Sequence, residues 1–341
     1  TDTPGGNNGT DFEVTSLDDP EPDMLPGSGT LREALSLGDN HRIVFAVGGT
    51  IDLKSRLNVR DRAFITIDGS TAPPPGIALQ GDALYVRNSN DIIVTHLRVR
   101  DSVGDGILIW DSSYNVVVDH CSVTDSADEN VAITEDTSDV TVSWSIIGHT
   151  RPDSFTRRSS GMLIASFSPQ TPVTRVSLHH NLFYNAFQRS PQISTDGLFD
   201  VRNNVIWNWG PNDDGGYGIR MRNGARGNII NNHFSNRSRA TQNAVLLADT
   251  AGPVHIIDSS GHEFIWFDTD AKSTASSAFD VAPVTTTRDL MFGYNLVVGW
   301  EYRVVRRIGA LPRVGIDRLI IGRTMAGIPR PRGIPTPRRT W

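Results

Sequence analysis

The sequence contains little cysteine and no long apolar run. A single cysteine, Cys121, excludes an intramolecular disulfide framework and any zinc site built from cysteines alone. No segment approaches the roughly 18–20 consecutive apolar residues of a membrane-spanning helix, so we expect no integral membrane protein and no membrane partner. The 341 residues are nevertheless 38% hydrophobic and 8% aromatic, which suffices for a sizeable core and excludes global disorder.

One short helix is expected near the N-terminus. Residues 1–27 are rich in Gly, Asp and Pro and show little periodicity, so they predict an irregular lead-in. Thr30 and Glu33 have the spacing of a capping box, in which side chains satisfy backbone N–H groups where a helix begins. Residues 43–47 then have the pattern of a buried strand that ends at Gly48 and Gly49.

Beyond this strand the sequence repeats itself. Residues 91–97, 115–121 and 139–145 resemble one another and begin 24 residues apart, and further copies follow at 175–181, 199–204 and 228–232. Short β-branched strands at this period are typical of a β-solenoid. A leucine-rich repeat would need regularly spaced Leu, and a propeller blade a period of roughly 40–50 residues. We therefore predict an all-β protein, a right-handed parallel β-helix with one short N-terminal helix and long side loops.

The charge is unevenly distributed along this predicted fold. The chain carries 32 Lys and Arg against 38 Asp and Glu, yet residues 302–341 contain ten Arg and one acid, Asp317. Blocks of like charge are usually solvated, and this one lacks interleaved aromatics, so we expect no nucleic-acid partner. We divide the chain into a β-helix domain with its lead-in, residues 1–301, and a basic, Pro-rich segment, residues 302–341, that packs on the helix or extends from it.

Equivalent repeat positions carry similar side chains. Three asparagines share one position, which predicts a stacked amide ladder that satisfies turn backbone: Asn181, Asn204 and Asn232. Cys121 and Ser145 occupy that position in earlier coils, so we interpret Cys121 as a small buried side chain and not a nucleophile. At the preceding position Trp144 interrupts a histidine row, which favours stacked structural rings over a metal site: His96, His120 and His180.

Two acids are candidates for the chemistry. A β-helix has no cleft of its own, so function must come from side chains and loops on an outer face. Asp105 and Asp128 are 23 residues apart, nearly one repeat, and should lie on neighbouring coils about 5 Å apart. Carboxylates this close either repel and shift their pKa values or share a hard cation such as calcium. We favour a calcium site, with a solvated acidic loop as the alternative.

Short motifs recur along the chain in a specific order and spacing. They occupy residues 27–34, 43–51, 67–73, 118–122, 140–144, 179–181, 189–191, 201–204 and 309–313. Together they resemble polysaccharide lyase family 1, the pectate lyase and pectin lyase family, over about residues 5–240 and 309–327. The resemblance implies a β-helix that cleaves polygalacturonate by β-elimination, is typically secreted and often depends on calcium.

The resemblance also assigns roles to individual residues. Arg189 falls on the family's catalytic arginine, and Asp105 and Asp128 fall on or beside its calcium carboxylates. Ala132 stands where a second acid often follows the position of Asp128, so Glu129 is our candidate for the replacement carboxylate and third metal ligand.

The candidate substrate-binding residues are arginines. A second arginine commonly follows the catalytic one closely, but Ser194 stands there. The family's lysine before residues 161–163 is missing, although Arg157 and Arg158 lie close by. Arg157, Arg158 and Arg220 are our candidates for binding the acidic polysaccharide. A related branch, the pectin lyases, acts on methylated polymer without calcium, and these substitutions keep that branch open.

The chemistry of elimination defines what Arg189 must do. The proton α to the uronate carboxylate is removed, and a cation against that carboxylate stabilises the enolate-like charge. Arg189 as the base has to lose a proton although guanidinium normally has a pKa above about 12, so we expect an alkaline optimum. Alternatively, Arg189 clamps a substrate carboxylate or packs on the wall.

The sequence thus predicts a secreted, monomeric lyase that releases unsaturated oligogalacturonides from polygalacturonate or pectin. The chain begins at Thr1 without Met or an apolar leader, which we interpret as processing or trimming. Motifs for nucleophilic hydrolysis, nucleotide binding and zinc proteolysis are missing. Two rival hypotheses remain: a polygalacturonase-like glycoside hydrolase, which needs paired catalytic carboxylates, and a non-catalytic carbohydrate-binding β-helix.

Overall fold

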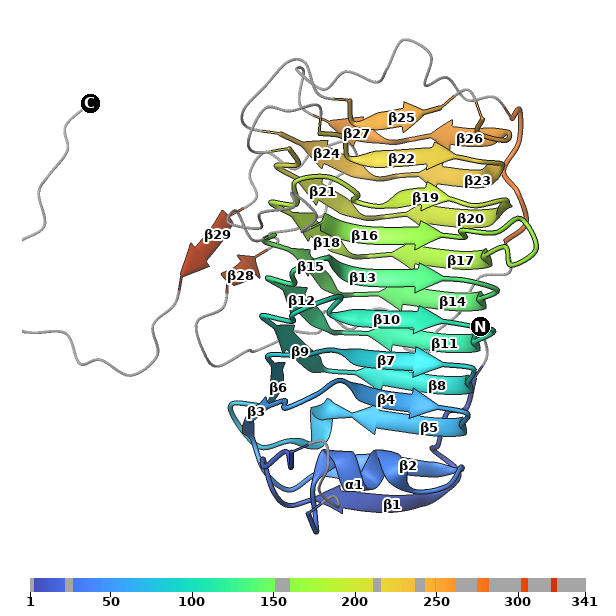
Figure 1. Ribbon diagram of the computed structural model, residues 1–341. Helices are drawn as coiled ribbons and strands as arrows, with labels where there is room; N and C mark the ends of the chain where they lie inside the picture. The colour runs from blue at the N-terminus through green and yellow to red at the C-terminus, as the bar shows by residue number, and fades with distance from the viewer. Residues whose placement is uncertain are drawn as a thin grey trace, which may run out of the picture. The chain divides into compact units, whose positions relative to one another are not determined.

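The chain winds into stacked coils of parallel strands (Figure 1). The structure, a computed structural model, describes residues 3–21, 27–150, 160–210, 216–236, 243–248, 250–261, 275–281, 302–305 and 320–323. Successive strands pass in turn through three sheets, named A, B and C in that order. The predicted right-handed parallel β-helix is confirmed.

Within the described residues, the three sheets contain ten, nine and eight strands. Sheet A comprises β1 (Thr10–Val14), β2 (His41–Phe45), β5 (Ala63–Asp68), β8 (Asn90–Thr95), β11 (Tyr114–Asp119), β14 (Ser138–Ser143), β17 (Thr174–His179), β20 (Gly197–Arg202), β23 (Ala225–Ile230) and β26 (Val254–Ile257). Sheet B comprises β3 (Gly49–Asp52), β6 (Ile77–Gln80), β9 (Leu97–Arg100), β12 (Ser122–Thr124), β15 (Ile146–Gly148), β18 (Leu182–Tyr184), β21 (Val205–Trp207), β24 (His233–Ser235) and β27 (Ser260–Gly261). Sheet C comprises β4 (Leu57–Arg60), β7 (Leu84–Arg87), β10 (Ile107–Trp110), β13 (Glu129–Thr134), β16 (Ser160–Ala165), β19 (Gln192–Ser194), β22 (Ile219–Arg222) and β25 (Val245–Leu247).

Neighbouring coils keep the register that the sequence repeat predicts. Val116 of β11 pairs with Ile92 of β8 and Val140 of β14, 24 residues away in either direction. Val142 pairs with Leu178, so the longer coil between them places its extra residues in the connections. The strand predicted at residues 43–47 is β2, which ends at Phe45 before the predicted glycines.

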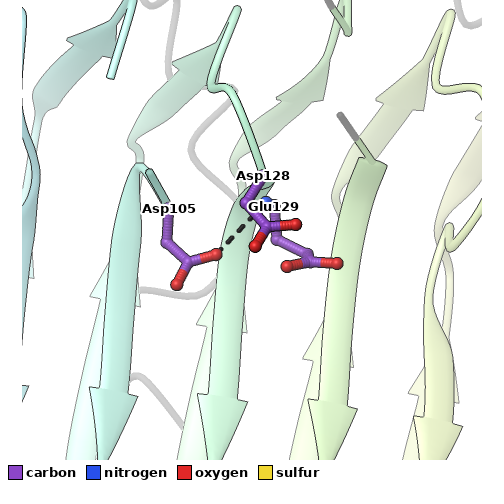
Figure 2. Close-up of side chains that lie close together, drawn as sticks. All are labelled: Asp105, Asp128 and Glu129. Atoms are coloured by element: carbon purple, nitrogen blue, oxygen red, sulfur yellow. Dashed lines mark hydrogen bonds between the residues drawn. The ribbon is translucent and has the colours of Figure 1, made fainter. Parts of the chain in front are cut away.

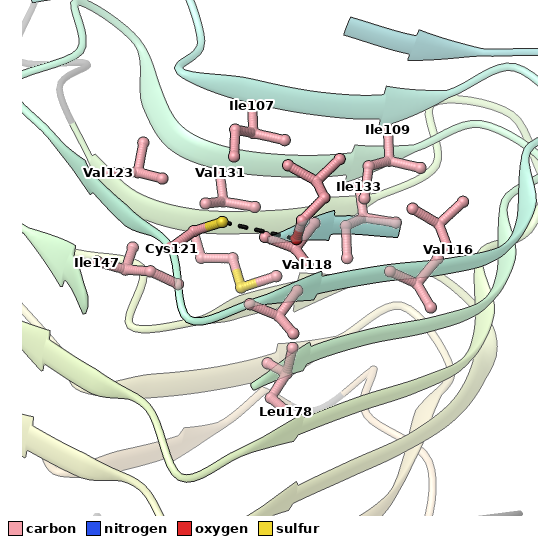
Figure 3. Close-up of a cluster of buried hydrophobic side chains, with 14 of the residues drawn as sticks. Ile107, Ile109, Val116, Val118, Cys121, Val123, Val131, Ile133, Ile147 and Leu178 are labelled. Atoms are coloured by element: carbon pink, nitrogen blue, oxygen red, sulfur yellow. Dashed lines mark hydrogen bonds between the residues drawn. The ribbon is translucent and has the colours of Figure 1, made fainter. Parts of the chain in front are cut away.

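The hydrophobic core fills the interior of the coils. Ile107 and Ile109 of β10 are fully buried, and so are their register partners Val131 and Ile133 of β13 (Figure 3). The residues between them point outward, as expected for the two-residue period of a strand. Burying one such aliphatic side chain contributes about 1.5–3 kcal/mol, so the stacked interior is the main source of stability.

The predicted ladder of turn side chains is present. The Asn204 Oδ1 atom accepts the backbone N–H of Asn181, and the Asn232 Oδ1 atom accepts that of Asn204, both at 3.0 Å. Ser145 Oγ accepts the N–H of Cys121 at 3.0 Å, and Asn181 Oδ1 accepts that of Ser145 at 2.9 Å. Cys121 is fully buried, and burial raises the pKa of its thiol to about 12. The prediction that Cys121 is a buried side chain is therefore confirmed.

The histidine row is a ring stack. The ring centroids of His96 and His120 are 4.9 Å apart, those of His120 and Trp144 are 6.1 Å apart, and those of Trp144 and His180 are 4.3 Å apart. All four residues have positive φ values between 48° and 59°, so they occupy the same turn of successive coils. The prediction of stacked structural rings is confirmed.

Helix α1 (Leu31–Ser36) closes the N-terminal end of the coils (Figure 1). Thr30 Oγ1 accepts the N–H of Glu33 at 3.2 Å, as the capping box predicts, while Glu33 Oε2 accepts the N–H of Gly29 at 2.6 Å. The helix contacts β1 and β4 and buries three side chains in the core: Leu31, Ala34 and Leu35. A single 3₁₀ turn, η1 (Gly69–Thr71), follows β5.

The chain consists of two compact units, Thr1–Phe292 and Gly293–Trp341. In the first unit, β26 confirms the strand predicted at residues 254–257. In the second, β28 (Tyr302–Val305) and β29 (Ile320–Arg323) form an antiparallel pair. The strand predicted at residues 296–298 and the extended segment at 328–333 lie outside the described residues. The boundary at residue 301 and the placement of the basic segment remain predictions.

Candidate active site

Three carboxylates lie where neighbouring strands of sheet C begin (Figure 2). Asp105 precedes β10, and Asp128 and Glu129 stand at the start of β13. The N–H of Gly106 donates to the Glu129 carbonyl at 2.9 Å, and the N–H of Asp128 donates to the Gly104 carbonyl at 3.2 Å. The parallel register therefore sets Asp105 opposite Glu129, with Asp128 one residue before it.

The three side chains are close enough to share one cation. One carboxylate oxygen from each of Asp105, Asp128 and Glu129 lies within 4.8 Å of the other two. Asp105 Oδ1 also accepts the backbone N–H of Glu129 at 3.1 Å, which fixes this carboxylate against the next coil. Sequence reasoning correctly placed Asp105 and Asp128 on neighbouring coils, and Glu129 joins them.

The electrostatics of the cluster favour protonation or a bound cation. Burial and the negative charge of Asp128 raise the pKa of Asp105 to about 6. Burial also raises the pKa of Glu129, and the neighbouring acids add to this shift against the opposing charge of Arg189. Carboxylate oxygens gathered in this way are the donors that calcium prefers. The residues present therefore fit a calcium ion.

Arg189 reaches the cluster from the connection between β18 and β19. Its carbonyl accepts the N–H of Met162 at 2.5 Å, and a side chain at Gly161 would come within 2.5 Å of that carbonyl oxygen. Glycine at position 161 thus lets the Arg189 backbone lie directly against β16. The Nη1 atom of Arg189 donates to Glu129 Oε1, and the Glu129 side chain is only 5% exposed.

Arg220 lies further along the same face. It pairs in register with Gln192 of β19, and its guanidinium lies 5.4 Å from the ring centroid of Tyr217. The Tyr217 hydroxyl donates to Gln192 Oε1. Burial raises the pKa of Tyr217, while the positive charges of Arg189 and Arg220 oppose that shift. Arg220 therefore belongs to the neighbourhood of Arg189, and Tyr217 lies near both arginines.

Some predicted positions do not reach the cluster. Arg157 and Arg158 lie outside the described residues. Ala132 points outward from β13, between the register partners Leu108 and Leu163, and is 2% exposed. Alanine at this position gives the cluster no further carboxylate, so Glu129 is the third acid.

Sequence reasoning missed Tyr217 and the contact between Arg189 and Glu129. The contact joins residues 60 positions apart, and no repeat relates them. Tyr217 could have been found from its place two residues before β22, on the coil after that of Arg189. Its ring lies at the side of the candidate site.

Comparisons with known proteins identify the relatives of this β-helix. Residues 54–206 match a family model described as a right-handed β-helix region. Two curated fungal proteins are named "probable pectate lyase C", one from Aspergillus terreus and one from Emericella nidulans. Each is 36% identical to this chain over an aligned region that covers 67% of it. The matches cover 51% and 49% of their lengths, so the chain spans about half of the curated relatives it matches.

Solved structures share the fold. The major allergen from cedar pollen superposes with a TM-score of 0.59 at 21% identity, over 82% of this chain and 84% of that one. A pectate lyase from Bacillus sp. N165, solved in complex with trigalacturonate, gives a TM-score of 0.56 at 17% identity, over 81% and 90% of the two chains. The solved structures share the parallel β-helix fold, and the fungal relatives confirm the resemblance to pectate lyases that the sequence motifs predicted.

Proposed function

We propose that the chain is a calcium-dependent polysaccharide lyase that cleaves polygalacturonate by β-elimination and releases unsaturated oligogalacturonides. The observation that carries the proposal is the group formed by Asp105, Asp128, Glu129 and Arg189 on the outer face of sheet C. The name of the fungal relatives supports pectate as the substrate. Carboxylates beside a guanidinium supply the two things that elimination needs, a cation site and a donor for substrate oxygen.

Asp105 and Asp128 are the residues that would hold calcium, with Glu129 as the third carboxylate. Calcium supplies positive charge against the uronate carboxylate and so stabilises the negative charge that develops next to it. Among the described residues, neither Asp105 nor Asp128 forms an ion pair, whereas Glu129 already pairs with Arg189. Asp105 and Asp128 are therefore the stronger ligands of the set.

Arg189 would act on the substrate directly above the cluster. A base role requires the guanidine of Arg189 to lose a proton. The Arg189 charge is already shared with Glu129, so holding a substrate carboxylate would fall to the N–H groups of Arg189 that do not face Glu129. A base role would require Glu129 to turn from Arg189 to another cation.

The remaining parts of the proposal concern the surroundings of the enzyme. Arg220, with Arg157 and Arg158, would bind further carboxylates of an acidic polysaccharide. A polymer of plant cell walls is met outside cells, so we propose a secreted enzyme that acts as a monomer. Among the described residues, no helix is long and apolar enough to cross a membrane.

One experiment tests the function. Unsaturated products absorb ultraviolet light, so absorbance is followed on polygalacturonate and on methylated pectin, each with calcium or with a chelator. We expect product from polygalacturonate in calcium and none in the chelator.

Each other outcome points to a different function. Full activity on methylated pectin in the chelator would assign the chain to the calcium-independent pectin lyases, as Ala132 and Ser194 allow. New reducing ends without unsaturation would indicate a glycoside hydrolase. Binding without any cleavage would indicate a carbohydrate-binding β-helix.

A further inference from the structure

The outer face of sheet C carries an exposed arginine on the far side of the acidic cluster from Arg220. Arg56 immediately precedes β4, and its guanidinium lies 5.0 Å from the ring centroid of Tyr85 on β7. Arg56 is exposed and Tyr85 is half-buried. A guanidinium over an aromatic face is held in place by cation–π attraction, while its N–H groups stay available around the edge.

Tyr85 links this arginine to the acidic cluster. It pairs in register with Leu108 of β10, the strand that Asp105 precedes. A side chain at Gly104 would come within 3.5 Å of the Tyr85 hydroxyl oxygen, so the ring ends against the loop that carries Asp105. The Arg56–Tyr85 pair therefore adjoins the candidate active site.

A second arginine of sheet C, Arg87, also lies over an aromatic ring but differs from Arg56 in its ion pairing. Arg87 lies 4.6 Å from the ring centroid of Trp110, but its Nε atom pairs with Asp111 at 2.7 Å. Among the described residues, the guanidinium of Arg56 forms no ion pair or hydrogen bond. The guanidinium of Arg56 is therefore available to an anionic ligand, whereas the charge of Arg87 is neutralised by Asp111.

The order of strands places these cations in one row across the sheet. Sheet C runs β22, β19, β16, β13, β10, β7, β4, with Arg220 at one end, the cluster in the middle and Arg56 at the other end. Six steps of about 4.8 Å make the row roughly 30 Å long. A polyanion that crosses the strands over the cluster meets a guanidinium on both sides.

We propose that Arg56, held on Tyr85, binds the carboxylate of a uronate unit of the substrate that lies beyond the unit at the cluster. This inference rests on the proposed function, because it takes polygalacturonate as the ligand. Each uronate unit repeats the same carboxylate, and a guanidinium accommodates a carboxylate with two parallel N–H···O bonds. The aromatic ring adds apolar surface for a sugar ring.

The test compares Arg56→Ala with a control on the same strand. Arg60 is also exposed on the outer face of β4, but its Nε atom lies 3.3 Å from Asp61. Oligogalacturonates of increasing length serve as ligands, and both binding, by calorimetry, and cleavage are measured. With long oligomers we expect Arg56→Ala to weaken binding and raise KM about tenfold with little change in kcat, as for a lost ground-state contact. Arg60→Ala should stay within about twofold, and Arg56→Lys should restore only part of the affinity, since it lacks the planar fork.

The length series decides the outcome. If Arg56 binds a distant unit, the shortest oligomers bind both proteins equally, and the gain in affinity with length is lost in Arg56→Ala. Equal affinities at every length, or the same loss at every length, would overturn the proposal. Absence of unsaturated product from the unmodified protein would instead overturn the proposed function. The affinities measured against oligomer length would still show whether Arg56 binds a distant uronate unit.

Discussion

The amide ladder and the acidic cluster both come from the stacking of side chains on successive coils, but one stabilises the fold and the other brings like charges together. Both arise because a parallel β-helix brings the same repeat position of successive coils together. In the ladder, the Asn204 side chain meets backbone and amide groups that complement it. In the cluster, Asp105 meets the like charges of Asp128 and Glu129. Stacking thus stabilises the fold where neighbouring side chains can hydrogen-bond to one another. Where the neighbouring side chains carry the same charge, stacking favours the binding of a proton or a cation.

The largest effect is expected at Arg189, which touches the cluster from outside the repeat. Arg189→Ala should lower turnover on polygalacturonate by about 10²–10⁴-fold if the arginine transfers the proton. A loss in kcat with little change in KM would indicate the base, and a raised KM would indicate a carboxylate clamp. Arg189→Lys keeps the charge but not the planar fork and should fail in both roles. Near-normal turnover of Arg189→Ala would exclude both roles.

Breaking the ladder should cost stability and leave the cluster intact. Asn204→Leu leaves the N–H of Asn181 and the carbonyl of Leu178 without their partner. Each buried polar group without a partner costs about 1–3 kcal/mol, so the loss of two partners should lower the free energy of unfolding by about 2–6 kcal/mol. Chemical denaturation measures the change, with the exposed Gln80→Ala of β6 as the control. A change below about 0.5 kcal/mol would show that the ladder is not a major stabilising element.

Removing one acid of the cluster should weaken the binding of calcium. We expect calcium to raise the melting temperature of the unmodified protein and to do so far less in Asp128→Ala, with calcium affinity lowered at least about tenfold. The calcium requirement for activity should rise in parallel, while the fold persists. Asp52→Asn, an exposed acid on β3 of sheet B, is the matched control. If calcium stabilises Asp128→Ala as strongly as the unmodified protein, the cluster is not the ion's site.

The smallest expected effect is a pH dependence that reports on Asp105. Its pKa in the folded protein, about 6, is above the ordinary value of 3.8, so the folded state retains this proton to higher pH than the unfolded state. In a chelator, its contribution to stability should therefore decline as pH rises from about 4 to about 6. Calcium should stabilise more at pH 7.5 than at pH 5, since it competes with protons. Melting curves of the unmodified protein and Asp105→Asn test this; the same pH dependence in both would assign it to other groups.

The fold could be predicted because its information is local and periodic. The repeat at residues 91–97, 115–121 and 139–145 fixed the strands of sheet A, and its turn positions predicted the ladder through Cys121 and Asn181. A strand alternates inward and outward residues, so the buried row follows from the sequence once the period is known.

The site was only partly predictable because outer faces and connections escape that periodicity. Asp105 and Asp128 were placed on neighbouring coils, but the backbone register sets Glu129, not Asp128, opposite Asp105. The contacts of Arg189 with Glu129 and of Arg56 with Tyr85 join residues 60 and 29 positions apart. Neither distance is a single repeat, and side chains on the outer face have no apolar pattern to mark them.

The short helix α1 packs against edge strands of two sheets. A coil that stacks on an identical coil leaves its last strands with unpaired N–H and C=O groups, ready to pair with another chain. Helix α1 contacts β4, the terminal strand of sheet C, and β1, the terminal strand of sheet A, and it buries Leu31 and Leu35 there. Covering these two edge strands should therefore oppose pairing with another chain at this end of the coils.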